Sequence, residues 1–139
     1  MNWKLIFQLS LFGLAMGLGT VFFISSTTEP FFWLVISIIS AYLIATRAAD
    51  RYFLHGVALG VANSIWVTGA HVLLFARYIA GHPREAAMMS SMPLPTHPRV
   101  MMLIMGPVIG VVSGIVIGLL AMLAHRLVAP RARPAVSSS

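Results

Sequence analysis

Four long apolar runs, separated by short polar segments, constrain this chain more than any other feature. They cover residues 5–24, 31–48, 52–76 and 100–128. A run of about 20 apolar residues is long enough to cross a bilayer as an α-helix. Because only 9% of the residues are charged, against about 25% in soluble domains, the runs indicate an integral membrane protein. The sequence predicts an all-α polytopic membrane protein whose four transmembrane helices pack as a bundle.

The spans use most of the 139 residues, so we expect a single transmembrane domain over residues 1–129 and no soluble catalytic domain. The tail, residues 130–139, is first basic and then serine-rich, and we expect it to be disordered. A cleaved secretory signal is the alternative interpretation of the first run, because Lys4 precedes it and small residues lie near Gly17. The run stays apolar to Ile24, which favours an uncleaved span.

The basic residues lie almost entirely between the apolar runs, which suits membrane orientation better than nucleic-acid binding. An even number of spans places both termini on one side. That side carries Lys4, Arg47, Arg51, Arg126, Arg131 and Arg133, and the other side carries Arg77, Arg84 and Arg99. By the positive-inside rule we expect both termini to be cytoplasmic, in a bacterial inner membrane.

Glycines spaced four residues apart form a glycine-zipper pattern. They are Gly106, Gly110, Gly114 and Gly118 in the fourth run, Gly56 and Gly60 in the third, and Gly13 and Gly17 in the first. This spacing keeps the glycines on one side of a helix, where another backbone can approach closely. The pattern predicts close helix packing. It leaves open whether the partner helices belong to the same chain or to a second copy.

The third run is the most polar of the four. Asn63, Ser64 and His71 fall on the same helical face as its glycines. Polar side chains at membrane depth face the interior and find partners there. We consider three interpretations: hydrogen bonds between helices, a polar cavity for a ligand or ion, and a metal or haem site through His71. The last is the weakest, because the sequence offers no evident second ligand.

The longest loop, residues 77–99, contains a second group of candidate ligands. These are His82, His97, Met88, Met89 and Met92, and residues 83–89 are expected to form a short surface helix. Thioether and imidazole groups suit copper, particularly Cu(I). The alternative interpretation is that the methionines pack at the membrane interface or against a partner.

Enzymatic constellations are nearly absent from the sequence. The carboxylates are Glu29, Asp50 and Glu85, none of them inside a predicted span, and the chain has no cysteine. A paired-carboxylate or thiol mechanism is therefore not expected, and no cofactor is predicted.

The leading hypothesis is a non-enzymatic packing or accessory subunit that self-associates or joins a larger membrane complex. Its expected partners are membrane lipids and, in an assembly, copies of itself or other membrane subunits, but no nucleic acid. The alternative is a small transporter or channel that uses the face bearing Asn63 and His71. A membrane enzyme or a copper-handling protein ranks third.

Overall fold

The computed structural model describes residues 1–128, and helices are the only regular secondary structure in that range. The four long helices are α1 (Trp3–Phe22), α2 (Glu29–Arg47), α3 (Tyr52–Leu73) and α6 (Pro98–Val128). Two short helices, α4 (Phe75–Gly81) and α5 (Pro83–Met89), connect α3 to α6. Each long helix is long and apolar enough to cross a membrane. The tail predicted to be disordered, residues 130–139, lies outside the described residues.

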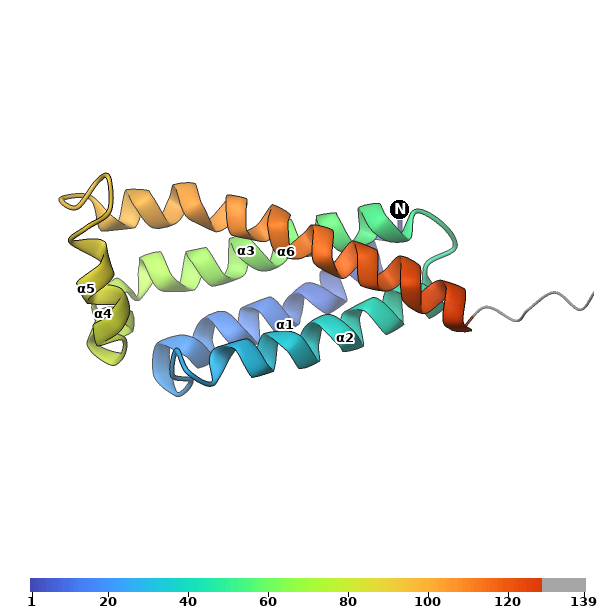
Figure 1. Cartoon of the computed structure of the whole chain (residues 1–139), viewed down its shortest axis with the longest axis horizontal. Coiled ribbons are helices and arrows are strands. Elements are labelled where there is room, and N and C mark those ends of the chain that lie inside the picture. The colour runs from blue at the N-terminus through green and yellow to red at the C-terminus, as the bar shows by residue number, and fades with distance from the viewer. Residues whose placement is uncertain (129–139) are drawn as a thin grey trace, which may run out of the picture.

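The four long helices run side by side, and α4 and α5 lie together at one end (Figure 1). We call this the loop end; it also holds the turn between α1 and α2. The opposite end, the terminal end, holds the N-terminus, the link between α2 and α3, and the last turn of α6 (Figure 1). The described chain therefore begins and ends at the same end of the molecule.

Local signals explain most helix boundaries. Pro30 lies in the first turn of α2 and Pro83 begins α5, where the missing N–H has no helical partner to lose. Arg51 turns the chain into α3 with a left-handed backbone, at φ 52°. The third apolar run divides at Leu74, so that α3 ends three residues before the predicted boundary. The following helix, α4, instead packs against the end of α1.

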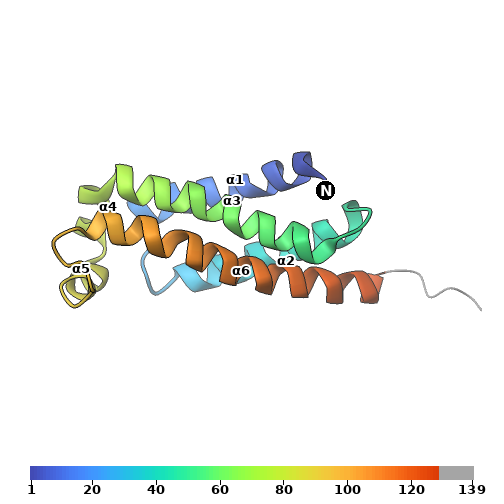
Figure 2. The ribbon, with the colours of Figure 1, turned by 90° about the horizontal axis from the view of Figure 1, so that it is seen from above.

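Helix α3 packs most extensively against α6 and next against α1, whereas α2 packs mainly against α6. Figure 2 shows α6 running alongside α3. The zipper glycines form this contact. A Cβ atom placed on Gly114 would lie 2.8 Å from the Cα of Val57, and one on Gly118 would lie 2.6 Å from the carbonyl oxygen of Phe53. Gly56 and Gly60 face α6 in the same way.

The remaining glycines of the pattern also contact other helices of the same chain. Gly106 faces the side chain of Thr68, and Gly110 faces Ser64. In α1, Gly13 faces Asn63 and Gly17 faces Val67. Each zipper glycine therefore has a neighbouring helix within the chain.

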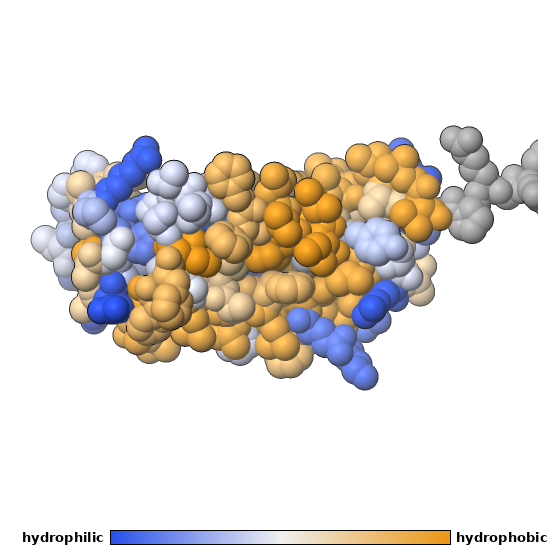
Figure 3. Space-filling view, turned by 90° about the horizontal axis from the view of Figure 1, so that it is seen from below, coloured by the Kyte–Doolittle hydropathy of each residue, from blue (hydrophilic) through white to orange (hydrophobic). Residues whose placement is uncertain are grey.

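A compact core fills the half of the molecule nearer the terminal end, with contributions from all four long helices. Its buried members are Leu5, Leu9, Ala41, Ile44, Ala48, Leu59, Ile117 and Ala121. Many other large apolar side chains point outward, and only 17% of the most apolar stretch of α6 is buried. On the face drawn in Figure 3, apolar residues form a hydrophobic band across the middle, with hydrophilic residues towards both ends.

The glycine contact between α3 and α6 predicts a sharp difference between two alanine substitutions. Gly114→Ala should destabilise the protein by about 1–3 kcal/mol, because its methyl group meets the backbone of α3. Gly69→Ala is the matched control: nothing lies within 4 Å of its added methyl group, and alanine favours helix. Thermal unfolding in detergent should show a lower midpoint for Gly114→Ala alone. Equal midpoints for the two variants would contradict this packing.

Candidate functional site

A cavity of about 400 Å³ lies between α2, α3 and α6 in the half of the molecule nearer the loop end. Figure 1 shows α2 and α6 close together at the terminal end and farther apart towards the loop end. Ile117, a member of the core, also lines the cavity, so the cavity ends at the core. Most of the lining is apolar, as in small-molecule sites of proteins.

Six of the nine methionines in the chain line this cavity. They are Met88, Met89 and Met92 from α5 and the loop after it, and Met101, Met102 and Met105 from α6. On α5, the spacing of Glu85, Met88 and Met89 places all three on one helical face. Methionine side chains are flexible and polarisable, so they adapt to ligands of differing shape.

The polar face predicted for the third run borders the cavity, and Asn63, Ser64 and His71 all line it. Asn63 is only 4% exposed, and its Oδ1 atom has no hydrogen-bond partner among the described residues. Its side chain also lies against Gly13 of α1. Ser64 donates its hydroxyl hydrogen to the carbonyl oxygen of Val61 in its own helix.

A hydrogen bond joins His71 to α1. Its Nε2 atom lies 2.7 Å from the hydroxyl oxygen of Thr20. The same hydroxyl lies 2.9 Å from the carbonyl oxygen of Met16 in its own helix. The contact with Thr20 holds the ring of His71, which also lines the cavity.

Three aromatic rings stack in series beside the cavity. The ring of Tyr78 lies 4.0 Å from that of His71 and 4.4 Å from that of His82. Burial raises the pKa of Tyr78 to about 12, and the charges of Glu29 and Glu85 contribute to this rise. The phenol therefore remains protonated throughout the physiological range.

Two carboxylates line the cavity near the loop end. Glu29 accepts a hydrogen bond from the indole N–H of Trp33 at 3.1 Å, and Trp33 also lines the cavity. Glu85 has one buried carboxylate oxygen without a hydrogen-bond partner among the described residues. No lysine or arginine of residues 1–128 belongs to the lining. The cavity is thus acidic in a chain of formal charge +6.

The structure separates the candidate copper ligands. Met88, Met89 and Met92 line the cavity. His82 stacks on Tyr78 outside the lining, and His97 is on the surface. His82 donates from Nδ1 to the carbonyl oxygen of Tyr78, and its buried Nε2 has no partner within the described range. No group of three or more His, Asp or Glu side chains in residues 1–128 is placed to hold a metal ion.

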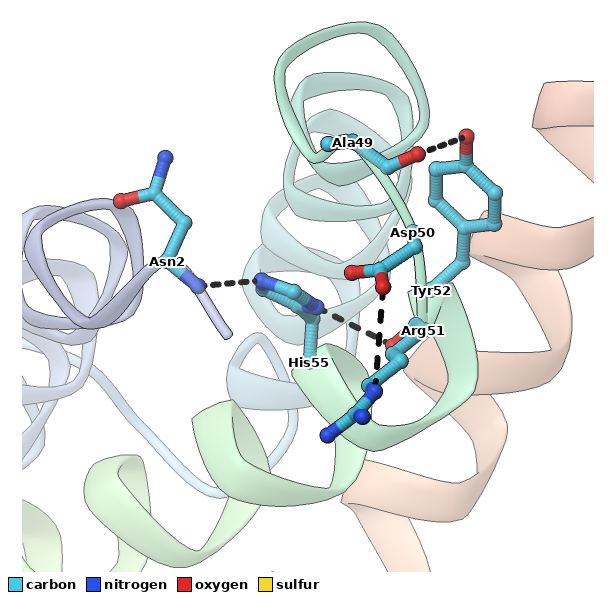
Figure 4. Close-up of polar contacts among 6 residues, drawn as sticks. All are labelled: Asn2, Ala49, Asp50, Arg51, Tyr52 and His55. Carbon is cyan, nitrogen blue, oxygen red and sulfur yellow. Dashed lines mark hydrogen bonds and ion pairs between the residues drawn. The ribbon is translucent and has the colours of Figure 1, made fainter.

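A second polar cluster lies at the terminal end (Figure 4). His55 is 1% exposed and uses both ring nitrogens: Nδ1 donates to the carbonyl oxygen of Arg51 at 3.0 Å, and Nε2 accepts from the backbone N–H of Asn2 at 2.8 Å. Asp50 forms an exposed ion pair with Arg51. Because His55 has no free hydrogen-bonding position, this cluster anchors the start of α1 and offers no group to a ligand.

Sequence reasoning did not include Glu29, Trp33, Tyr78 and Glu85 in a site. Glu29 and Glu85 were placed only outside the predicted spans. The spacing of Glu29 and Trp33, four residues apart, was the available signal, as was the shared face of Glu85 and Met88 on α5. Tyr78 carried no such signal, because the turn that brings it against His71 is a tertiary feature.

The class of protein that these observations define is an all-helical chain with four potential membrane-spanning helices and an acidic, methionine-rich cavity. Comparison with known proteins finds no family model that matches the chain, and no similar curated protein or solved structure.

The contact between Thr20 and His71 predicts a measurable effect on stability. Thr20→Val should lower the free energy of unfolding by about 1 kcal/mol, because Nε2 of His71 loses its hydrogen-bond partner. Thr46→Val is the matched control. Thr46 also donates to a carbonyl four residues earlier, but it is exposed and binds no other helix. Unfolding midpoints in detergent should fall for Thr20→Val only, and an equal fall for both variants would show that the interhelical bond contributes nothing.

Proposed function

We propose that the chain is a multi-pass membrane protein whose four long helices form a transmembrane bundle with both termini in the cytoplasm. The apolar band of Figure 3 supports insertion, because soluble proteins rarely expose contiguous apolar surface of this extent. Of the described basic residues, Lys4, Arg47, Arg51 and Arg126 belong to the terminal end and Arg77, Arg84 and Arg99 to the loop end. This distribution supports a cytoplasmic terminal end.

Single cysteines test this topology, because the chain has none of its own. In intact cells, an impermeant thiol reagent should label Thr27→Cys and Ser91→Cys at the loop end and spare Ala49→Cys at the terminal end. All three positions are exposed. The reverse pattern would invert the proposed orientation, and labelling of all three would contradict a four-span arrangement.

We infer that the protein binds a hydrophobic small molecule within the bundle. The cavity carries this inference: its volume of about 400 Å³ falls within the range of about 300–1,000 Å³ typical of ligand pockets. Its walls are apolar with a few polar groups, the composition that such sites use to bind and orient a ligand. The adaptable methionines support a binding role more than a rigid packing role.

The shape of the cavity favours binding over an open channel. Ile109 lines it and is nevertheless 65% exposed, so the cavity opens at the side of the helices. A molecule dissolved in the surrounding bilayer can enter by this route. Towards the terminal end the core around Ile44, Leu59 and Ile117 closes the interior. Within residues 1–128 this closed core supports ligand binding over conduction along the axis.

A packing or accessory subunit is the second candidate function. The zipper glycines are the observation that favours it, since they indicate selection for close helix contacts. In the structure, however, these glycines contact other helices of the same chain, and thus provide no free seam for a second copy. The ligand-binding proposal accounts for the cavity, which helix packing alone does not explain.

A cavity-filling substitution tests ligand binding. The full chain in phosphatidylcholine nanodiscs should bind the neutral fluorophore N-phenyl-1-naphthylamine saturably, at one molecule per chain, after subtraction of empty nanodiscs. Ser37→Phe should weaken this binding at least about tenfold, because Ser37 lines the cavity. Ile38→Phe is the control, since Ile38 is 55% exposed and lies outside the lining. Absence of saturable binding by the unaltered chain would favour the packing function.

A further inference from the structure

The charges at the cavity oppose those of the rest of the chain. Two of the three carboxylates, Glu29 and Glu85, line the cavity. None of the lysines and arginines within residues 1–128 does so. The chain has nine basic residues. If acidic and basic side chains were interspersed over the surface, basic residues would be expected at the cavity as well. A ligand in the cavity therefore meets only acidic formal charges.

Neither carboxylate forms an ion pair with a basic residue of residues 1–128. The ion pair found in residues 1–128 joins Asp50 to Arg51 at the other end of the molecule. At the loop end, the guanidinium group of Arg77 lies over the ring of Phe22 at 5.8 Å, and that of Arg99 lies over Phe75 at 5.2 Å. Both arginines are thus directed at aromatic rings.

One of the two carboxylates also has a buried oxygen without a hydrogen bond in residues 1–128. The buried Oε2 atom of Glu85 has no hydrogen-bond partner within the described range. Glu29 accepts a hydrogen bond from the indole N–H of Trp33. A charged group removed from water is costly unless an opposite charge or hydrogen bonds compensate it. A cationic ligand would supply that compensation.

Other groups of the cavity favour the same ligand. The thioether sulfurs of the methionines are polarisable and uncharged, so they do not repel a cation. The indole of Trp33 offers an aromatic ring, to which cations are attracted. These groups surround the same cavity as Glu29 and Glu85.

We propose that the cavity is selective for amphiphilic organic cations, whose charged group lies beside Glu29 and Glu85 and whose apolar body lies against the methionines. This inference rests on the proposed ligand-binding function and names its substrate class. The volume of about 400 Å³ suits an organic body, whereas a bare metal ion would leave most of it unfilled. Quaternary ammonium and phosphonium compounds have the required combination of charge and apolar surface.

Two lipophilic ions of nearly the same shape and opposite charge test the proposal. Tetraphenylphosphonium and tetraphenylborate are each titrated by equilibrium dialysis against the full chain in phosphatidylcholine nanodiscs, with empty nanodiscs subtracted. The cation should displace N-phenyl-1-naphthylamine and bind about tenfold more tightly than the anion, a modest ratio because both carboxylates are partly exposed. The net positive charge of the protein would by itself favour the anion.

Substitutions then locate the source of the preference. Glu29→Gln combined with Glu85→Gln should abolish it while retaining binding of the neutral fluorophore, and each single variant should reduce it. Glutamine keeps an oxygen that can accept from Trp33. Asp50→Asn is the matched control, because it removes one negative charge at the terminal end and should preserve the preference.

The outcomes separate the two proposals. Equal binding of both ions, or a preference unaffected by the double substitution, overturns cation selectivity and leaves ligand binding intact. A cation that binds without displacing the fluorophore also overturns it, because the cation site is then outside the cavity. If neither the ions nor the fluorophore bind saturably, the ligand-binding function itself fails.

Discussion

The close contact between α3 and α6 is the interaction on which the rest of the structure depends. Glycines on both helices let their backbones approach so closely that no Cβ atom fits at Gly56, Gly60 or Gly114 without displacement of the facing helix. For the transmembrane bundle proposed above, van der Waals packing of this kind would supply the association energy, because lipid provides little hydrophobic driving force between helices. The pair provides a surface against which α1 and α2 are placed.

The cavity follows from the way α2 meets this pair. Its buried residues, Ser40, Ala41, Ile44 and Ala45, all lie in its second half. The first half of α2 thus contributes Glu29, Trp33 and Ser37 to an open space instead of a packed interface. Helices α4 and α5 cross the same end and bring Tyr78, Glu85, Met88 and Met89 to that space. The close contact between α3 and α6, together with the separation of α2 from this pair at the loop end, is sufficient to form a pocket in a short chain.

The sequence predicted the four long apolar helices and the short helix at residues 83–89, because hydrophobic length and proline position are local signals. It also placed Asn63, Ser64 and His71 on one face, which the helical period determines. It did not place Glu29 and Glu85 at the cavity. Each lies outside the apolar runs, and only the tertiary arrangement of α2 and α5 relative to α3 brings both carboxylates to one cavity. Whether the glycines contact helices of the same chain or of a second copy likewise depended on the tertiary arrangement of the helices.

The contrast between two histidines of α3 shows why hydrogen-bond partners, more than residue type, distinguish structural from functional groups. His55 and His71 are both on α3 and both contact α1. His55 bonds through both nitrogens to backbone groups, those of Asn2 and Arg51, and so ties the N-terminus to the start of α3. His71 bonds through one nitrogen to the side chain of Thr20 and also lines the cavity. The same helix therefore anchors the closed half of the molecule through His55 and contributes a ring held by one hydrogen bond to the open half through His71.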